Sequence, residues 1–229
     1  MRIAEIYQSI QGEGLLTGRE SVFIRTSGCN LRCRFCDTPY TSWAPEGEDL
    51  SVSEILARIA PWSATEQVVL TGGEPMLQSE LVPLTLELRG LGKHITIETA
   101  GTLDLPVECD LMSISPKRAN STPGVERDPR WHARHERERH VPDVVRRLIG
   151  RYAYQLKFVI DTPADLADVK SYLAEFPEIK QERVLLMPQG TSVEELAERA
   201  AWLEPYCAEQ GLQYCPRKHI EWFGFTRGT

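Results

Sequence analysis

The sequence predicts a single α/β domain whose parallel strands form a partial, open barrel of the TIM type. Short apolar runs typical of buried strands alternate along the chain with longer segments of helical periodicity. Such alternation gives parallel strands joined by right-handed crossovers. The 229 residues suffice for one core but not for a complete eight-unit barrel with insertions. We therefore expect about six parallel strands in one domain covering residues 1–229.

The expected elements follow from the apolar patterns and from the residues that border them. A short first strand is expected at 3–7, before the barrel strands 22–26, 67–71, 94–98, 111–114, 154–160 and 183–187. Helices are expected at 52–60, 79–91, 143–150, 162–176 and 193–209. Ser51 with Glu54, and Ser192 with Glu195, form capping boxes at two of the helix starts, and Gly211 is expected to end the last helix.

A charged insertion interrupts this alternation from about residue 118 to 141. The 23 residues from Arg118 to His140 contain almost no core-forming side chains. We therefore expect a surface excursion that is dispensable for the chemistry. Its histidines, His132, His135 and His140, are not expected to bind metal, because no strand or helix face is predicted to fix them.

Composition and charge exclude several functional classes. The net charge of −7 disfavours non-specific binding to nucleic acid, which requires a basic face. No run of about 20 apolar residues is present, and residues 1–5 lack the hydrophobic region of a signal peptide, so we expect a cytoplasmic protein without a membrane span. In that compartment the six cysteines favour a metal site and buried thiols over disulfides.

Three cysteines lie within eight residues, directly after the expected strand 22–26. Cys29, Cys33 and Cys36 have the spacing C-x₃-C-x₂-C in a loop at 28–38. Three thiolates can bind three irons of a [4Fe–4S] cluster and leave the fourth iron open. A ferredoxin cluster or a structural zinc site would need a fourth ligand. Because Cys109, Cys207 and Cys215 are distant in sequence, we favour a cluster with one open iron and keep a zinc-binding module as the alternative.

Further motifs follow the expected strands. Strand 67–71 runs into Gly72-Gly73-Glu74-Pro75, where the glycines let the backbone approach a ligand closely. Strand 94–98 ends in Glu98-Thr99-Ala100-Gly101-Thr102, and strand 111–114 in Ser115-Pro116-Lys117. Residues 8–14 read Q-S-I-Q-G-E-G, which by turn statistics alone is an ordinary turn. Parallel α/β sheets bind their ligands at the carboxyl ends of the strands, where most of these motifs lie.

The cysteine spacing, with Phe35 before the last cysteine, and the G-G-E-P motif resemble the radical S-adenosylmethionine (SAM) superfamily. The segment 8–14, the later strand ends and the tail 214–229 closely resemble the 7-carboxy-7-deazaguanine synthase family within it. This resemblance implies a [4Fe–4S] cluster, SAM and Mg²⁺ as cofactors, and a reduced barrel with few covering helices. It also implies a homodimer and a flavodoxin- or ferredoxin-like electron donor.

The implied reaction converts 6-carboxy-5,6,7,8-tetrahydropterin to 7-carboxy-7-deazaguanine and ammonia, a carbon–nitrogen lyase step in queuosine biosynthesis. No side chain is expected to act as a catalytic nucleophile. A small radical SAM activase that acts on a partner protein would share the cysteines and G-G-E-P, and it remains an alternative.

The resemblance also assigns the site residues by motif. It implies Cys29, Cys33 and Cys36 as cluster ligands and Thr38 as a ligand of Mg²⁺. It implies Phe35, Asp37, Gly73, Glu74, Ser115, Pro116, Lys117 and Gln189 for SAM. It implies Ile10, Gln11, Gly12, Glu13, Arg25, Thr71, His219 and Thr229 for the pterin. From the residues alone, Arg25 could equally form an ordinary salt bridge, Thr38 could be a turn residue, and the tail could be a packing strand.

Overall fold

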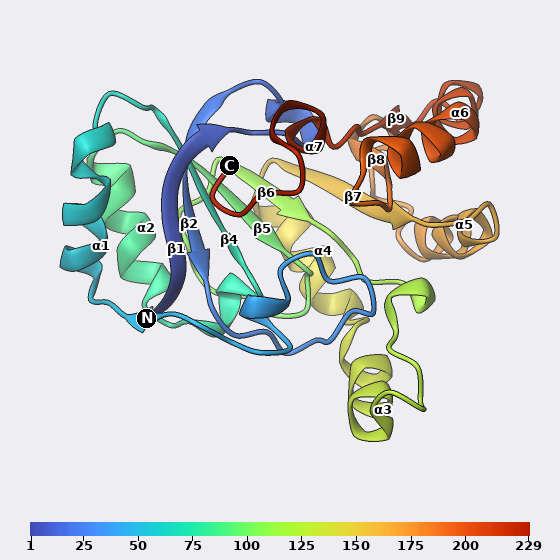
Figure 1. The fold of residues 1–229 in the computed structure, drawn as a ribbon, viewed down its shortest axis with the longest axis horizontal. Helices are drawn as coiled ribbons and strands as arrows, with labels where there is room; N and C mark the ends of the chain where they lie inside the picture. Colours follow the sequence, from blue (N-terminus) through green and yellow to red (C-terminus); the bar gives the residue numbers. More distant parts are fainter.

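The structure, a computed structural model, describes residues 1–229 and contains one open nine-stranded sheet (Figure 1). The strands run in the order β3-β1-β2-β4-β5-β6-β7-β8-β9. Their bounds are β1 Arg2–Ile10, β2 Glu20–Thr26, β3 Glu48–Asp49, β4 Gln67–Gly72, β5 His94–Thr99, β6 Leu111–Ile114, β7 Tyr154–Ile160, β8 Val184–Pro188 and β9 Gln213–Tyr214. The strands from β2 to β9 pair in parallel, whereas β1 is antiparallel to both β2 and β3. The predicted open α/β sheet is confirmed, and it does not close into a barrel.

Seven α-helices accompany the sheet. Their bounds are α1 Val52–Ile59, α2 Leu81–Gly90, α3 Pro129–Glu138, α4 Pro142–Arg151, α5 Asp165–Glu175, α6 Val193–Gln210 and α7 Lys218–Phe223. Both predicted capping boxes are present at the starts of α1 and α6. Gly211 ends α6 with a φ of 66°, a left-handed conformation that glycine adopts without a steric penalty. None of the helices is both long and apolar enough to cross a membrane.

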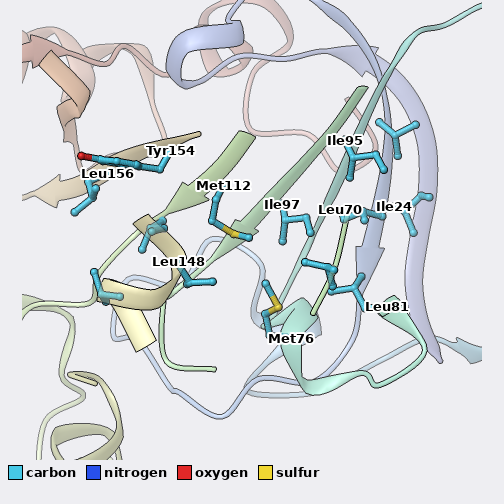
Figure 2. Packing of buried hydrophobic residues seen from close by; sticks show 14 of the residues in the cluster. Ile24, Leu70, Met76, Leu81, Ile95, Ile97, Met112, Leu148, Tyr154 and Leu156 are labelled. Atoms are coloured by element: carbon cyan, nitrogen blue, oxygen red, sulfur yellow. The ribbon is translucent and has the colours of Figure 1, made fainter. Parts of the chain in front are cut away.

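Strict alternation of side chains along the strands separates the core from the site. Ile24, Leu70, Ile97 and Met112 belong to a core of 32 buried residues, part of which is shown in Figure 2. Side chains at alternating positions of the same strands, such as Arg25, Thr71, Glu98 and Ser113, line a cavity instead. Because successive side chains of a strand point to opposite faces, one sheet face packs on helices and the other forms the site.

The charged insertion contains a helix, α3, that the sequence analysis does not predict. Asp128 caps α3 by accepting hydrogen bonds from the backbone N–H groups of Arg130 and Trp131, and Pro129 occupies the first turn. His135 on this helix is fully buried. Periodicity does not reveal this helix because α3 carries no apolar stripe and is held by a few polar and aromatic contacts. Figure 1 shows α3 set apart from the helices that cover the sheet.

At the ends of the chain the structure corrects one expectation and rules out one alternative. Strand β1 continues to Ile10, so residues 8–10, expected in a loop, pair with β2. The tail is not a packing strand either, because only Gln213–Tyr214 joins the sheet and α7 follows.

Candidate active site

A cavity of about 520 Å³ opens at the carboxyl ends of the parallel strands. All of the predicted site residues line it except Glu74 and Pro116. Those lining it are Ile10, Gln11, Gly12, Glu13, Arg25, Cys29, Cys33, Phe35, Cys36, Asp37, Thr38, Thr71, Gly73, Ser115, Lys117, Gln189, His219 and Thr229. A volume of this size is typical of sites for small molecules and cofactors.

The cysteine loop follows β2 and is held to the neighbouring strand by its backbone. The N–H of Gly28 donates to the Thr41 carbonyl over 2.8 Å, and the Gly28 carbonyl accepts from the N–H of Glu74 over 2.9 Å. The three cysteines of the loop are free thiols. Burial raises the pKa of Cys29 and of Cys33 to about 12 each, so both are protonated when no metal is bound. Coordination of a metal must therefore displace their protons.

The arrangement of the three thiols fits a cluster better than a single ion. Cys29, Cys33 and Cys36 share the wall of one large cavity. No group of three or more His, Cys, Asp or Glu side chains is arranged to hold one metal ion. Three cysteines on one wall fit a [4Fe–4S] cube, in which each cysteine binds a different iron.

The two glycines after β4 allow the strand end to approach the cysteine loop. A Cβ atom on Gly72 would lie 2.2 Å from the Thr26 carbonyl oxygen, and one on Gly73 would lie 2.2 Å from that of Gly28. Any side chain would clash with backbone at both positions. Gly73 consequently presents only backbone to the cavity.

Glu74 is fully buried and does not face the cavity. Its carboxylate accepts hydrogen bonds from the Thr99 hydroxyl and the Ala100 N–H, both over 2.8 Å, and from the Met76 N–H over 3.1 Å. Burial raises the pKa of this carboxyl group. Glu74 therefore ties the end of β4 to the end of β5. Pro116 is likewise buried beneath the cavity wall.

A buried network of charges joins the loop after β1 to β7 and to the tail. Lys157 Nζ lies 2.8 Å from a carboxylate oxygen of Glu13 and 3.5 Å from one of Glu98. Arg217 donates from Nε to Glu13 over 3.1 Å, from Nη1 to the Gly190 carbonyl over 2.6 Å, and from Nη2 to Asp37. The network thus spans the glycine-rich loop, two strands, the cysteine loop and the tail.

The charges in this network stabilise one another. Burial alone would raise the pKa of Glu13, but Lys157 and Arg217 outweigh it and hold that pKa well below its usual value. Burial would lower the pKa of Lys157, but Glu13 and Glu98 raise it. Burial also lowers the pKa of His219. The site therefore offers an ionised carboxylate and fixed cations beside a neutral imidazole.

Sequence reasoning missed Glu98, Lys157 and Arg217, all of which line the cavity. The sequence nevertheless contains features that point to these three residues. Lys157 interrupts an apolar strand, where a lysine is seldom buried without a partner. Glu98 ends a strand, and Arg217 lies two residues before His219.

The structure is compatible with a binding role and with a structural role for both Arg25 and Thr38. Arg25 donates from Nε to Glu5 over 2.6 Å and from Nη2 to the Tyr7 hydroxyl over 2.9 Å, so it forms a salt bridge and also lines the cavity. Thr38 precedes the short 3₁₀ turn Pro39–Thr41, and its Oγ1 lies 3.9 Å from Cys36 Sγ and faces the same cavity.

The tail docks on the glycine-rich loop after β1. The N–H of Lys218 donates to the Gly12 carbonyl over 3.0 Å, and a Cβ atom on Gly12 would lie 2.5 Å from the His219 nitrogen. Further along the tail, Arg227 pairs with Glu5 and Glu46 and stacks over the Tyr40 ring at 3.9 Å. Residues 224–229 thereby form one side of the cavity.

Comparison with known proteins identifies the family. The model of the radical SAM superfamily matches residues 23–121. The 7-carboxy-7-deazaguanine synthase of Rhodopirellula baltica is 49% identical over 99% of this chain and 88% of the relative. That of Halobacterium salinarum is 44% identical over 95% of this chain and 88% of the relative. The chain belongs to the 7-carboxy-7-deazaguanine synthase family.

The fold agrees with this membership. The crystal structure of QueE from Escherichia coli superimposes with a TM-score of 0.71 at 23% identity, over 94% of this chain and 92% of that one. As a radical SAM member of the 7-carboxy-7-deazaguanine synthase family, the protein is an enzyme that uses a [4Fe–4S] cluster and SAM. The relatives support this interpretation and not the activase or the zinc module.

Proposed function

We propose that the protein converts 6-carboxy-5,6,7,8-tetrahydropterin to 7-carboxy-7-deazaguanine and ammonia in the biosynthesis of queuosine and related 7-deazapurines. The observation that carries this proposal is a single cavity lined by the three cysteines, by the motif residues for SAM and by a ring of polar and charged side chains. The bound cluster and SAM would supply hydrogen-atom abstraction from the pterin.

The chain's own residues would bind and orient the reactants. Cys29, Cys33 and Cys36 would hold the cluster beside the backbone of Gly73. Phe35, Asp37, Ser115, Lys117 and Gln189 would contact SAM. Lys117 Nζ already donates to the Ser115 hydroxyl over 2.7 Å, which orders this wall. Because both reactants bind in one cavity, the entropy cost of bringing them together is met on binding and not in the chemical step.

The polar ring would match the pterin. The amino and ring N–H groups of the pterin require acceptors, which Glu13 and Thr229 would provide. Lys157 and Arg217 would keep Glu13 ionised and fixed in place. Arg25 would approach the substrate carboxylate or a ring carbonyl. The remaining contacts would come from Ile10, Gln11, Gly12, Thr71 and His219.

Four further features belong to the same proposal. Mg²⁺ would bind the Thr38 hydroxyl, substrate oxygens and water, since magnesium commonly keeps several waters. A flavodoxin- or ferredoxin-like protein would reduce the cluster. The enzyme would act as a homodimer. A cytoplasmic location would keep the six free cysteines reduced.

Anaerobic incubation with SAM, a reductant and the carboxypterin tests the proposal. We expect a new ultraviolet spectrum and a product of the mass of 7-carboxy-7-deazaguanine. The Cys33→Ala variant serves as the control without a complete cluster. If the parent protein cleaves SAM but leaves the carboxypterin unchanged, the proposed substrate is wrong.

A further inference from the structure

The charged insertion contacts the cysteine loop through a buried histidine. His135 on α3 is fully buried and does not line the cavity. Its Nδ1 accepts a hydrogen bond from the backbone N–H of Arg32 over 3.1 Å. Its Nε2 lies 2.9 Å from the hydroxyl of Ser121. A fully buried imidazole outside the site, bonded at both nitrogens, indicates a positioning function.

The direction of these hydrogen bonds is fixed by their partners. The Ser121 hydroxyl donates its one hydrogen to the Arg118 carbonyl over 2.6 Å, so it must accept from His135 Nε2–H. Nδ1 must be unprotonated because it accepts from Arg32. The ring is therefore neutral, and burial lowers its pKa to about 4, in agreement with this assignment.

The same insertion holds the other side of Cys33. The Ser121 carbonyl accepts from the backbone N–H of Arg34 over 2.8 Å. The guanidinium of Arg32 stacks over the Trp131 ring of α3 at 3.9 Å. The N–H groups of the two residues that flank Cys33 are thus both bonded to the insertion. The cysteine loop contains no helix or strand between residues 28 and 36 that could hold them instead.

We propose that Ser121 and His135 form a clamp that positions Cys33 for the iron–sulfur cluster. Without the clamp the backbone N–H of Arg32 would be left without an acceptor, and the Leu31–Arg32 peptide that leads into Cys33 would lose a bond that fixes its orientation. The loss of one fixed thiolate weakens a cluster that has only three protein ligands. The proposal rests on the cluster that the family implies, but not on the identity of the pterin.

Two substitutions of His135 distinguish a positioning role of this residue from a packing role. In His135→Asn the side-chain oxygen replaces Nδ1 and can still accept from Arg32. In His135→Gln the amide nitrogen replaces Nε2, which keeps the bond to Ser121 but leaves Arg32 without an acceptor. Both variants are polar and smaller than or similar in size to histidine. His132→Ala on the same helix is the matched control, since His132 bonds only to the Pro123 carbonyl.

The measurement is the anaerobic rate of iron release from the reconstituted full chain to a ferrous chelator, together with the electron paramagnetic resonance spectrum of the reduced cluster. We expect roughly tenfold faster release and an altered spectrum for His135→Gln, because a buried N–H loses its acceptor. His135→Asn is expected to stay within about threefold of the parent because it retains that bond. The His132→Ala control is expected to match the parent. Melting temperatures of the metal-free chains show whether folding is affected.

Equal release rates for His135→Asn and His135→Gln would overturn the clamp and leave His135 as a packing residue. If His135→Gln fails to fold, His135→Leu replaces it, because leucine fills a similar volume and also leaves the Arg32 N–H without an acceptor. Iron release from His135→Leu at the parent rate would also refute the proposal. A parent that retains iron but does not convert the carboxypterin would refute the proposed function and leave the clamp intact.

Discussion

At the scale of single residues, the site is built from charges that are stable only in each other's presence. Glu13, Lys157 and Arg217 are each nearly inaccessible to solvent on their charged groups, and each has at least one partner of opposite charge. Removing one member of such a set is costly because it leaves an uncompensated buried charge. The network therefore fixes Glu13, which we propose as a pterin-binding residue, and also stabilises the fold.

We expect Lys157→Met to lower the free energy of unfolding by about 3 to 5 kcal/mol, because Glu13 and Glu98 lose their shared cation. The depressed pKa of Glu13 contributes stability above its unfolded pKa near 4.5, and this contribution is lost as the pH falls below that value. The difference in unfolding free energy between variant and parent should consequently shrink below about pH 4.5. Urea unfolding at several pH values measures this difference. Lys180→Met, at an exposed position without an ion pair, is the control. If Lys157→Met lowers the free energy of unfolding as little as Lys180→Met does, the prediction is wrong.

Thr38→Ala is expected to keep the cluster and SAM cleavage while weakening pterin turnover and its stimulation by Mg²⁺. Thr38 faces the cavity next to Cys36, but a hydroxyl is not needed to complete the three-cysteine ligand set. Turnover across a magnesium titration is the measurement, with Thr38→Ser as the variant that restores the hydroxyl. Identical magnesium responses in parent and Thr38→Ala would rule out the assignment of the metal.

At the scale of elements, the sequence predicts those whose signals are local. Strands β2 and β4 to β8 follow apolar runs, and α1 and α6 begin at capping boxes that need only four neighbouring residues. Helix α3 has a local start signal in Asp128 and Pro129 but no apolar stripe, and its stability depends on long-range contacts, chiefly His135 with Arg32 and Trp131 with the same arginine. Periodicity cannot reveal a helix whose partner is an irregular loop about 100 residues away in sequence.

The insertion is therefore expected to be needed for the cluster, in contrast to the expectation from sequence. A chain in which Ala119 is joined to Arg139 loses both bonds to the N–H groups beside Cys33. We expect it to fold, since the insertion contributes no residue to the main core, but to hold less than half of the parent's iron and sulfide after reconstitution. Circular dichroism and iron analysis test these two statements separately. Full iron content in the shortened chain would restore the original expectation.

At the scale of the whole molecule, distant parts of the chain converge on one cavity. The motifs at strand ends predict many of its lining residues, because parallel strands bring their carboxyl ends to one edge of the sheet. The contacts of the tail could not be predicted from periodicity. Arg217 reaches Glu13 across 204 residues, and only the folded chain reveals that partner. Similarly, the buried position of Glu74 follows from its bonds to β5 and not from its place in the G-G-E-P motif.

The tail gives a final prediction that separates binding from folding. Deleting Gly228 and Thr229, or replacing His219 by Ala, is expected to raise the KM for the pterin roughly tenfold or more, because each change removes a polar partner from the cavity wall. Gly228 is exposed and Thr229 bonds only to the Thr226 carbonyl, so the deletion should leave the melting temperature and the iron content close to the parent values.

Trp222→Ala is the matched control for this prediction. Trp222 lies on α7, is 43% exposed and does not line the cavity, so its removal should leave the KM unchanged. Steady-state kinetics and thermal unfolding on the same preparations distinguish the two roles of the tail. A large fall in melting temperature with an unchanged KM would show that the tail only stabilises the fold. A raised KM at an unchanged melting temperature indicates instead that the tail binds the substrate directly, in agreement with the positions of His219 and Thr229 on the cavity wall.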